Sequence, residues 1–234
     1  MSMGTTGTIS LFSQQVLGLL GGLFLLTAFA LIVTRQLLAN LMMFAVQSVL
    51  LAASALTLGC ASSSTHLVVV AGLTILMKPL LIPWLLRRIL SRDMYARREI
   101  SQVLSIPTAL LVAVGLATLA YFIASPLVAG ADPAVRINLP VGMAGLLLGA
   151  FAMTVRREAM PQVLAILSME NGAFFAGIAI APDLPLIAEL AASFDMLIIA
   201  LVVGLLTKQI DERVGRTPVG ELVALKEDSA KWSS

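Results

Sequence analysis

Four polar side chains fall near the middle of long apolar stretches, where they could carry protons or small ions. They are Gln47, Lys78, Glu170 and Asp195. A charged group in hydrocarbon costs several kcal/mol unless it is neutralised, paired or hydrated. Two carboxylates and one ammonium at similar depth therefore indicate a buried relay, in which protonation of one group changes the electrostatic environment of the next. Gln47 is more typical of a hydrogen bond between helices.

The lysine lies in a proline-containing segment, MKPLLIPWLLRR (77–88). Pro79 and Pro83 each remove a backbone donor and free a carbonyl one turn earlier. Freed carbonyls beside Lys78 would make a polar place that holds water. The alternative is an ion pair that only fixes the register of two helices. In either case we expect Lys78 to be buried beside an acidic residue, either Glu170 or a carboxylate of a neighbouring protein.

Each acidic residue has a structural interpretation beside the functional one. Glu170 is about ten residues into its apolar stretch, where proton exchange is the functional interpretation. Its structural alternative is a hydrogen bond to Asn171 or Ser168. Asp195 would be either a relay carboxylate or a neutral carboxyl held by Ser193 and a neighbouring helix.

The composition places these residues in a membrane protein. Hydrophobic residues make up 59% of the 234 residues and charged residues 12%, against roughly 25% charged in soluble domains. The mean hydropathy is +0.99, and apolar runs of about 20 residues recur, as in transmembrane helices. One cysteine, Cys60, excludes an internal disulfide, a multi-cysteine iron–sulfur site and a cysteine-based zinc site, and one histidine, His66, leaves no histidine cluster for a haem pair or a metal. No nucleophile elbow, phosphate loop or HExxH-type metal motif occurs in the sequence.

The sequence predicts an all-α fold with about seven transmembrane helices. Thirteen of the fifteen Lys and Arg residues lie at helix ends on one side, which predicts a cytoplasmic C-terminus and an outer N-terminus. Glycine runs at 18–22 and 142–149 predict close helix packing. The expected domains are a four-helix region 1–130, a three-helix module 131–213 and a cytoplasmic tail 214–234. The expected spans are 11–34, 37–59, 66–86, 103–128, 139–155, 160–181 and 185–208.

The second half of the chain resembles a known family of small membrane proteins. The segment LLLGAFAMTVRREAMPQVLAILSMENGAFFAGIAIA (146–181) is similar to the first two helices of the K subunit of complex I and the C subunit of Mrp antiporters. Arg156 and Arg157 match the basic pair of that family, and Glu170 matches its glutamate. The segment LAASFDMLIIALVVGLL matches the third helix, with Asp195 in place of a second glutamate.

Four preceding spans and a lysine–proline third span make the whole chain similar to component E of hydrogenase-4-type complexes, the group 4 hydrogenase and formate hydrogenlyase family. This resemblance implies a non-catalytic subunit of the bacterial or archaeal cytoplasmic (inner) membrane, without a cofactor of its own. Its partners would be antiporter-like membrane proteins and one similar to the quinone-site H subunit of complex I, with a peripheral iron–sulfur arm. The implied role is redox-coupled proton or sodium movement through the relay candidates Glu170, Lys78, Asp195 and Gln47.

Two other functions fit the same residues. A self-contained secondary transporter needs internal repeats around a midplane site. Spans one to three and five to seven do show a similar order of basic ends and mid-span polar residues, in parallel orientation. A purely structural scaffold would need the buried charges only for helix packing.

Overall fold

Every secondary-structure element in the described part of the chain is helical. The computed structural model describes residues 10–84 and 103–180, together with helical positions at Ile198, Leu201, Val202, Leu205, Leu206 and Gln209. Six helices in these ranges are long and apolar enough to cross a membrane, so the fold is that of a multi-pass membrane protein. They are α1 (Leu11–Val33), α2 (Leu37–Ser62), α3 (Thr65–Ile75) with the π-helical turn η1 (Leu76–Leu81), α6 (Ile106–Leu127), α7 (Pro133–Val155) and α8 (Ala159–Ile180).

The predicted seventh span, 185–208, lies outside the described residues except for isolated helical positions. The same holds for Asp195, for the basic segment 87–98 and for the tail after 213. The count of seven helices and the orientation of the termini therefore stay predictions.

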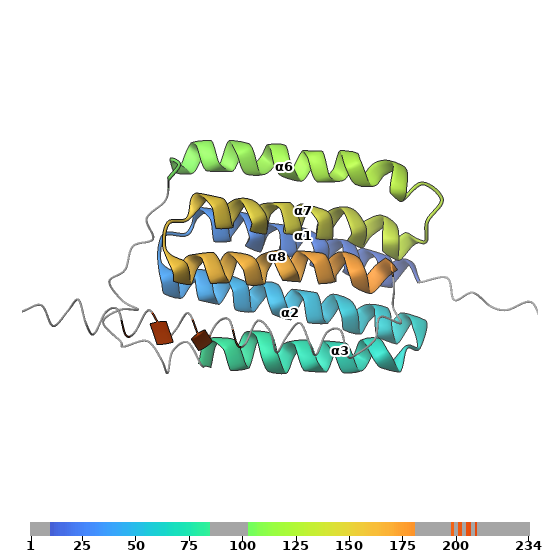
Figure 1. Ribbon diagram of the computed structural model, residues 1–234. Coiled ribbons are helices and arrows are strands. Elements are labelled where there is room, and N and C mark those ends of the chain that lie inside the picture. The colour runs from blue at the N-terminus through green and yellow to red at the C-terminus, as the bar shows by residue number, and fades with distance from the viewer. Residues whose placement is uncertain are drawn as a thin grey trace, which may run out of the picture.

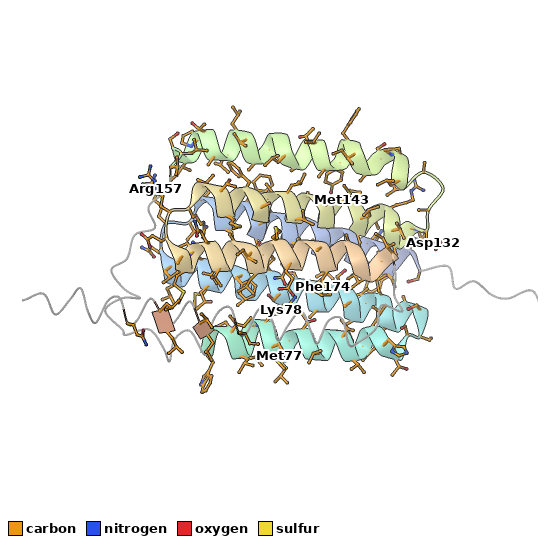
Figure 2. All side chains as sticks on the ribbon, in the orientation of Figure 1. Met77, Lys78, Asp132, Met143, Arg157 and Phe174 are labelled. Atoms are coloured by element: carbon orange, nitrogen blue, oxygen red, sulfur yellow. The ribbon has the colours of Figure 1, made fainter. Side chains whose placement is uncertain are left out.

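The six helices run alongside one another, with α6 at one edge and α3 at the other (Figure 1). Between them α1, α2, α7 and α8 form the centre, in which α7 packs on both α8 and α1, and α2 packs on α1, α3 and α8. Helix α6 contacts α7 on a face whose buried side chains are all alanine. Arg157 and Asp132 lie at opposite ends of the bundle (Figure 2), and below we call these ends the Arg157 side and the Asp132 side.

Helix α7 begins earlier than the sequence predicts. The predicted start is 139, whereas the helix begins at Pro133. Proline suits the first turn of a helix because its missing N–H is not needed there. The polar character of Arg136 and Asn138 hid this start, yet Asn138 is fully buried inside the helix. The other five spans agree with prediction to within about three residues at each end.

The predicted glycine packing at 142–149 is confirmed at the contact between α7 and α8. A β-carbon at Gly142 or Gly149 of α7 would collide with the backbone of Ala176 or Met169 of α8. A β-carbon at Gly172 would collide with the α7 backbone in turn. The two backbones therefore touch directly, as small residues allow in membrane helices. In the run 18–22 the prediction holds only at Gly21, where a β-carbon would lie 3.2 Å from the side chain of Val141 in α7, whereas one at Gly18 or Gly22 would meet no atom within 4 Å.

The first and second halves of the bundle share a pattern. Helices α1 and α7 each have 23 residues, and the step from Leu11 to Leu37 equals the step from Pro133 to Ala159. In each half the first helix packs on the second, and α2 also packs on α8. The second helix of each half, α2 and α8, carries buried polar side chains, and these two helices pack on each other at the centre of the bundle.

Candidate functional site

A buried ion pair joins α8 to the π-helical turn η1. Nζ of Lys78 lies 3.1 Å from Oε1 of Glu170, and only 1% and 8% of the two side chains are exposed. The expectation that Lys78 is buried beside an acidic residue is confirmed, with Glu170 as its partner. Because both groups lie inside a bundle long enough to span the bilayer, each charge is compensated by the other rather than by bulk water.

The local sequence explains how Lys78 reaches this position. Pro79 has no N–H and would clash with the carbonyl of Ile75 in a regular α-helix. The chain widens instead into a π turn, in which the N–H of Ile82 donates to the carbonyl of Met77, five residues back. Turns of this kind occur as single interruptions of α-helices and are frequent at functional sites.

An aromatic ring covers the ammonium. Nζ of Lys78 lies 4.5 Å from the centroid of Phe174, and Figure 2 shows the two side chains together at mid-bundle. Phe174 follows Glu170 by one helical turn, so α8 presents both the carboxylate and the ring to the lysine. A cation over an aromatic face gains about 2 kcal/mol when desolvated. The ring therefore attracts the ammonium of Lys78 and helps to hold it beside Glu170.

Amide and hydroxyl groups continue the polar site towards α2. Nδ2 of Asn171 donates to Oγ of Ser48 at 2.9 Å and to Oε1 of Gln47 at 3.5 Å. All three side chains are fully buried. Among the described residues, Nε2 of Gln47 and Oδ1 of Asn171 have no hydrogen-bond partner. Buried polar atoms of this kind are usually satisfied by ordered water, so the site suits internal water beside the ion pair.

The structure thus brings three of the four predicted residues into one cluster. Lys78 and Glu170 touch, and Gln47 is linked to the neighbour of Glu170. Asp195 lies outside the described residues. Ser48 and Phe174 were not predicted from the sequence, although the position of Phe174 one turn after the glutamate was a usable signal. Within residues 10–84 and 103–180, no three His, Cys, Asp or Glu side chains gather as a metal site requires.

A second buried cation lies at the Arg157 side of the bundle. Arg156 is 2% exposed and donates to the carbonyls of Leu31 and Pro161 and to Oδ1 of Asn40. Burial lowers the pKa of the Arg156 guanidinium to about 10, so the group stays protonated at neutral pH. It ties the end of α1 and the starts of α2 and α8 together.

We expect Arg156→Met to lower the unfolding free energy by about 2–4 kcal/mol, because it leaves buried acceptors without donors. The thermal unfolding midpoint of the detergent-solubilised chain should fall by roughly 5–10 °C. Arg157→Met is the matched control, since the neighbouring arginine is exposed. Equal midpoints for the two variants would contradict a structural role for Arg156.

Comparison with known proteins identifies relatives that span nearly the whole chain. The protein Rv0085 of Mycobacterium tuberculosis, described as uncharacterized, is 31% identical over 208 residues, which cover 88% of this chain and 94% of Rv0085. The chain belongs to the Rv0085 family. Hydrogenase-4 component E of Escherichia coli K12 is a more distant relative, 26% identical over 222 residues, covering 91% of this chain and 98% of that protein. The same protein of Shigella flexneri is equally similar.

No protein-family model and no solved structure matches the chain. The helix contacts and the ion pair of this member of the Rv0085 family are therefore taken from the bundle described above. The distant likeness to hydrogenase-4 component E agrees with the resemblance found in the sequence. The likeness of the second half to a K subunit or an Mrp C subunit stays a prediction.

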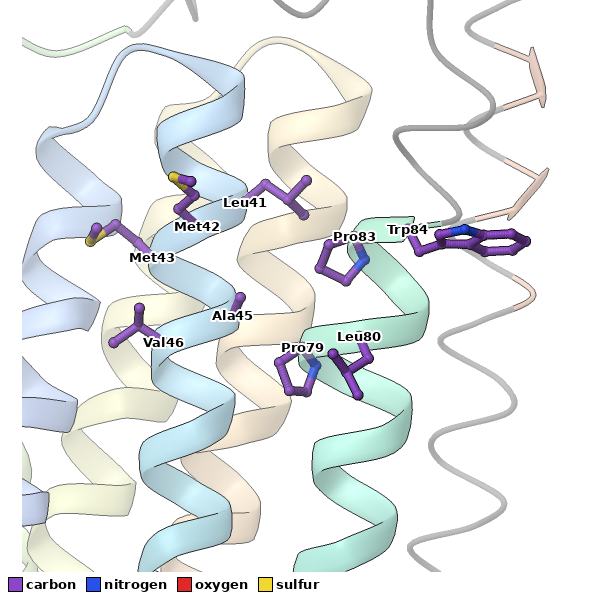
Figure 3. A pocket seen from close by; sticks show the side chains of 9 residues that line it. All are labelled: Leu41, Met42, Met43, Ala45, Val46, Pro79, Leu80, Pro83 and Trp84. Atoms are coloured by element: carbon purple, nitrogen blue, oxygen red, sulfur yellow. The ribbon is translucent and has the colours of Figure 1, made fainter.

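An apolar groove of about 630 Å³ lies on the other side of the lysine-bearing turn in this Rv0085-family chain. Figure 3 shows Pro79, Pro83 and Trp84 on one wall and the first turns of α2 on the other. The prolines therefore face the groove while Lys78 faces the interior. The remaining lining residues are Leu41, Met42, Met43, Ala45, Val46 and Leu80.

Proposed function

We propose that the chain is a non-catalytic membrane subunit of a complex I-related, hydrogenase-type complex, in which buried charges couple redox chemistry in partner proteins to proton or sodium movement. The observation that carries the proposal is the ion pair between Lys78 and Glu170, enclosed with incompletely satisfied amides at the centre of the bundle. The full-length likeness to hydrogenase-4 component E supports the assignment to such a complex.

In this mechanism the ion pair works as a two-state element. When a proton reaches Glu170, its attraction for Lys78 falls, and the lysine can then release a proton or shift towards another carboxylate. Asn171 and Gln47 would hold the water through which protons move. Asp195 of the predicted seventh span is the proposed next acidic member of the relay.

The proposed assembly follows the domain division of the sequence. Residues 131–213 would form a K-like module and residues 1–130 an additional four-helix region, with the tail 214–234 on the cytoplasmic side. The proposed partners are antiporter-like proteins and a protein similar to the H subunit of complex I, all in the bacterial or archaeal inner membrane. Because the chain offers no cofactor motif of its own, the driving reaction belongs to a partner arm.

Purification of the chain from its native membrane tests the proposal. We expect a C-terminally tagged chain in mild detergent to bring down antiporter-like and H-like proteins with a peripheral iron–sulfur arm. An untagged strain carried through the same steps is the control. A chain that purifies alone and transports ions in liposomes would contradict the proposal and favour a self-contained transporter, for which the parallel halves of the bundle are the supporting feature.

A further inference from the structure

Helix α2 carries a buried polar side chain at every seventh residue. Asn40, Gln47 and Ser54 are all fully buried. Seven residues make about two turns and rise about 10.5 Å, so the three side chains lie on one face of α2 at three depths of the membrane. Each meets a polar group of another element: Asn40 accepts from Arg156, Gln47 from Asn171, and Ser54 from Asn138.

Of these three polar contacts along α2, the one nearest the Asp132 side, between Ser54 and Asn138, leaves a hydrogen-bonding atom unsatisfied. Nδ2 of Asn138 lies 3.4 Å from Oγ of Ser54, a long hydrogen bond. Oδ1 of Asn138 is buried and has no hydrogen-bond partner among the described residues. An unsatisfied amide oxygen in an apolar interior costs about 1–3 kcal/mol, so this position requires a donor that the side chains in residues 10–84 and 103–180 do not supply. Water is the donor that such sites usually hold.

The same condition recurs one level deeper, beside the ion pair, at Gln47 and Asn171. Between the two levels the interior holds an apolar cluster, and the side chain of Thr74 is buried on α3 one turn from Lys78. Leu51 is buried there, and the rings of Phe24 and Phe175 are fully buried with their centroids 4.5 Å apart. From Ser48 to Ser54 the rise along α2 is about 9 Å. About three water molecules in single file, roughly 2.8 Å apart, would cover that distance.

We propose that Ser54 and Asn138 form a water-holding step that connects the ion pair with the Asp132 side of the membrane, and that Phe24 and Phe175 form the hydrophobic barrier between the two. The ion carried by this step rests on the proposed function, whereas water access to the step does not. Asn138 of α7 thereby acts as a positioning residue, because its amide oxygen would hold the water of this path. The ion reaches or leaves the bilayer centre along α2 on this side.

Accessibility of a thiol at Ser54 tests the water path. In a Cys60→Ser background, which removes the single native cysteine, we compare Ser54→Cys with Leu56→Cys. Leu56 is 44% exposed on the outer surface of the same helical turn. Vesicles containing the whole complex are treated with Ag⁺, a thiol reagent small enough for single-file water. We expect Ag⁺ added at the Asp132 side to block the thiol of Ser54→Cys at least tenfold faster than that of Leu56→Cys.

Transport measurements test whether this path carries the ion. We expect Asn138→Leu to lower ion translocation more than tenfold, with redox turnover retained, and Asn138→Ser to keep at least half of it. Thr57→Val is the control, because the hydroxyl of Thr57 donates to the carbonyl of Ala53 in the preceding turn of α2. Full translocation in Asn138→Leu overturns the proposal, as do equal rates of Ag⁺ blocking at positions 54 and 56.

The two proposals can fail separately. If Glu170→Gln abolishes translocation while the thiol at 54 is not reached, the path fails and the proposed function stands. If Glu170→Gln translocates normally while the thiol at 54 is reached faster than the control, the proposed function fails and the water-holding step stands.

Discussion

Glu170→Gln should remove most ion translocation from the assembled complex while redox turnover with artificial acceptors continues. Glutamine keeps the shape of the side chain and much of its hydrogen bonding, but it cannot take up a proton. Since Glu170 touches Lys78 directly, the substitution removes the carboxylate on which the proposed relay depends. We expect translocation to fall at least tenfold. Translocation at the wild-type rate would show that the carboxylate is structural.

A double variant that removes both charges should keep its thermal stability but lose ion translocation. Lys78→Met alone leaves a buried carboxylate without its ammonium, which costs about 3–5 kcal/mol. Lys78→Met combined with Glu170→Met removes both charges, and such replacements are often neutral or stabilising. We therefore expect the double variant to recover the thermal stability of the wild type and to remain unable to translocate ions. If the two charges serve only as a scaffold, the double variant should recover both the thermal stability and the ion translocation of the wild type.

The measurement is acid or sodium uptake by inverted vesicles, normalised to redox turnover and to the amount of assembled complex. Glu158→Gln is the matched control, because Glu158 is a carboxylate between α7 and α8 outside the membrane spans. Equal loss in Glu158→Gln and Glu170→Gln would point to a general effect of charge rather than to the ion pair.

Gly172→Ala should prevent stable folding, although it adds a single methyl group. The new β-carbon would collide with the backbone of Gly145 and Leu146 and lie 2.9 Å from the carbonyl oxygen of Gly142. These atoms belong to the α7 backbone, so no side chain can move aside and the helices must separate. Overpacking of this kind costs about 1–3 kcal/mol and occasionally more. We expect at least about 3 kcal/mol here, because the close approach of the two backbones extends from Gly142 beside Ala176 to Gly149 beside Met169.

Gly115→Ala in α6 is the control for this substitution. A β-carbon added at Gly115 would meet no atom within 4 Å, and alanine favours a helix over glycine by about 1 kcal/mol. The control should therefore fold at least as well as the wild type. Yields and unfolding temperatures of the two variants in detergent provide the comparison. Similar values would mean that α7 and α8 tolerate separation.

The spans and the ion pair could be predicted from the sequence because their signals are strong and local. An apolar run of about 20 residues has few structural alternatives, and an isolated ammonium in hydrocarbon is too costly to persist. The polar start of α7 was missed because Arg136 and Asn138 resemble a loop when their neighbours are unknown. Ser48 was missed for a related reason: a serine in a membrane helix gives no sign of which helix it faces.

Arg156 illustrates a different limit. Both arginines of the pair at 156 and 157 predict a membrane boundary equally well. Only the packing of α1, α2 and α8 around the first distinguishes a buried connector from an exposed charge.

The backbone contact between α7 and α8 makes the two partners of the ion pair mechanically unequal. Glu170 stands on a stiff element, since helices in direct backbone contact cannot slide or tilt without collision. Lys78 stands on a compliant one, because the π turn and two prolines of its helix remove regular backbone hydrogen bonds. A force that separates the pair is therefore absorbed mainly by bending at the lysine. When the pair separates, the carboxylate of Glu170 therefore keeps its position in the bundle and the ammonium of Lys78 is displaced.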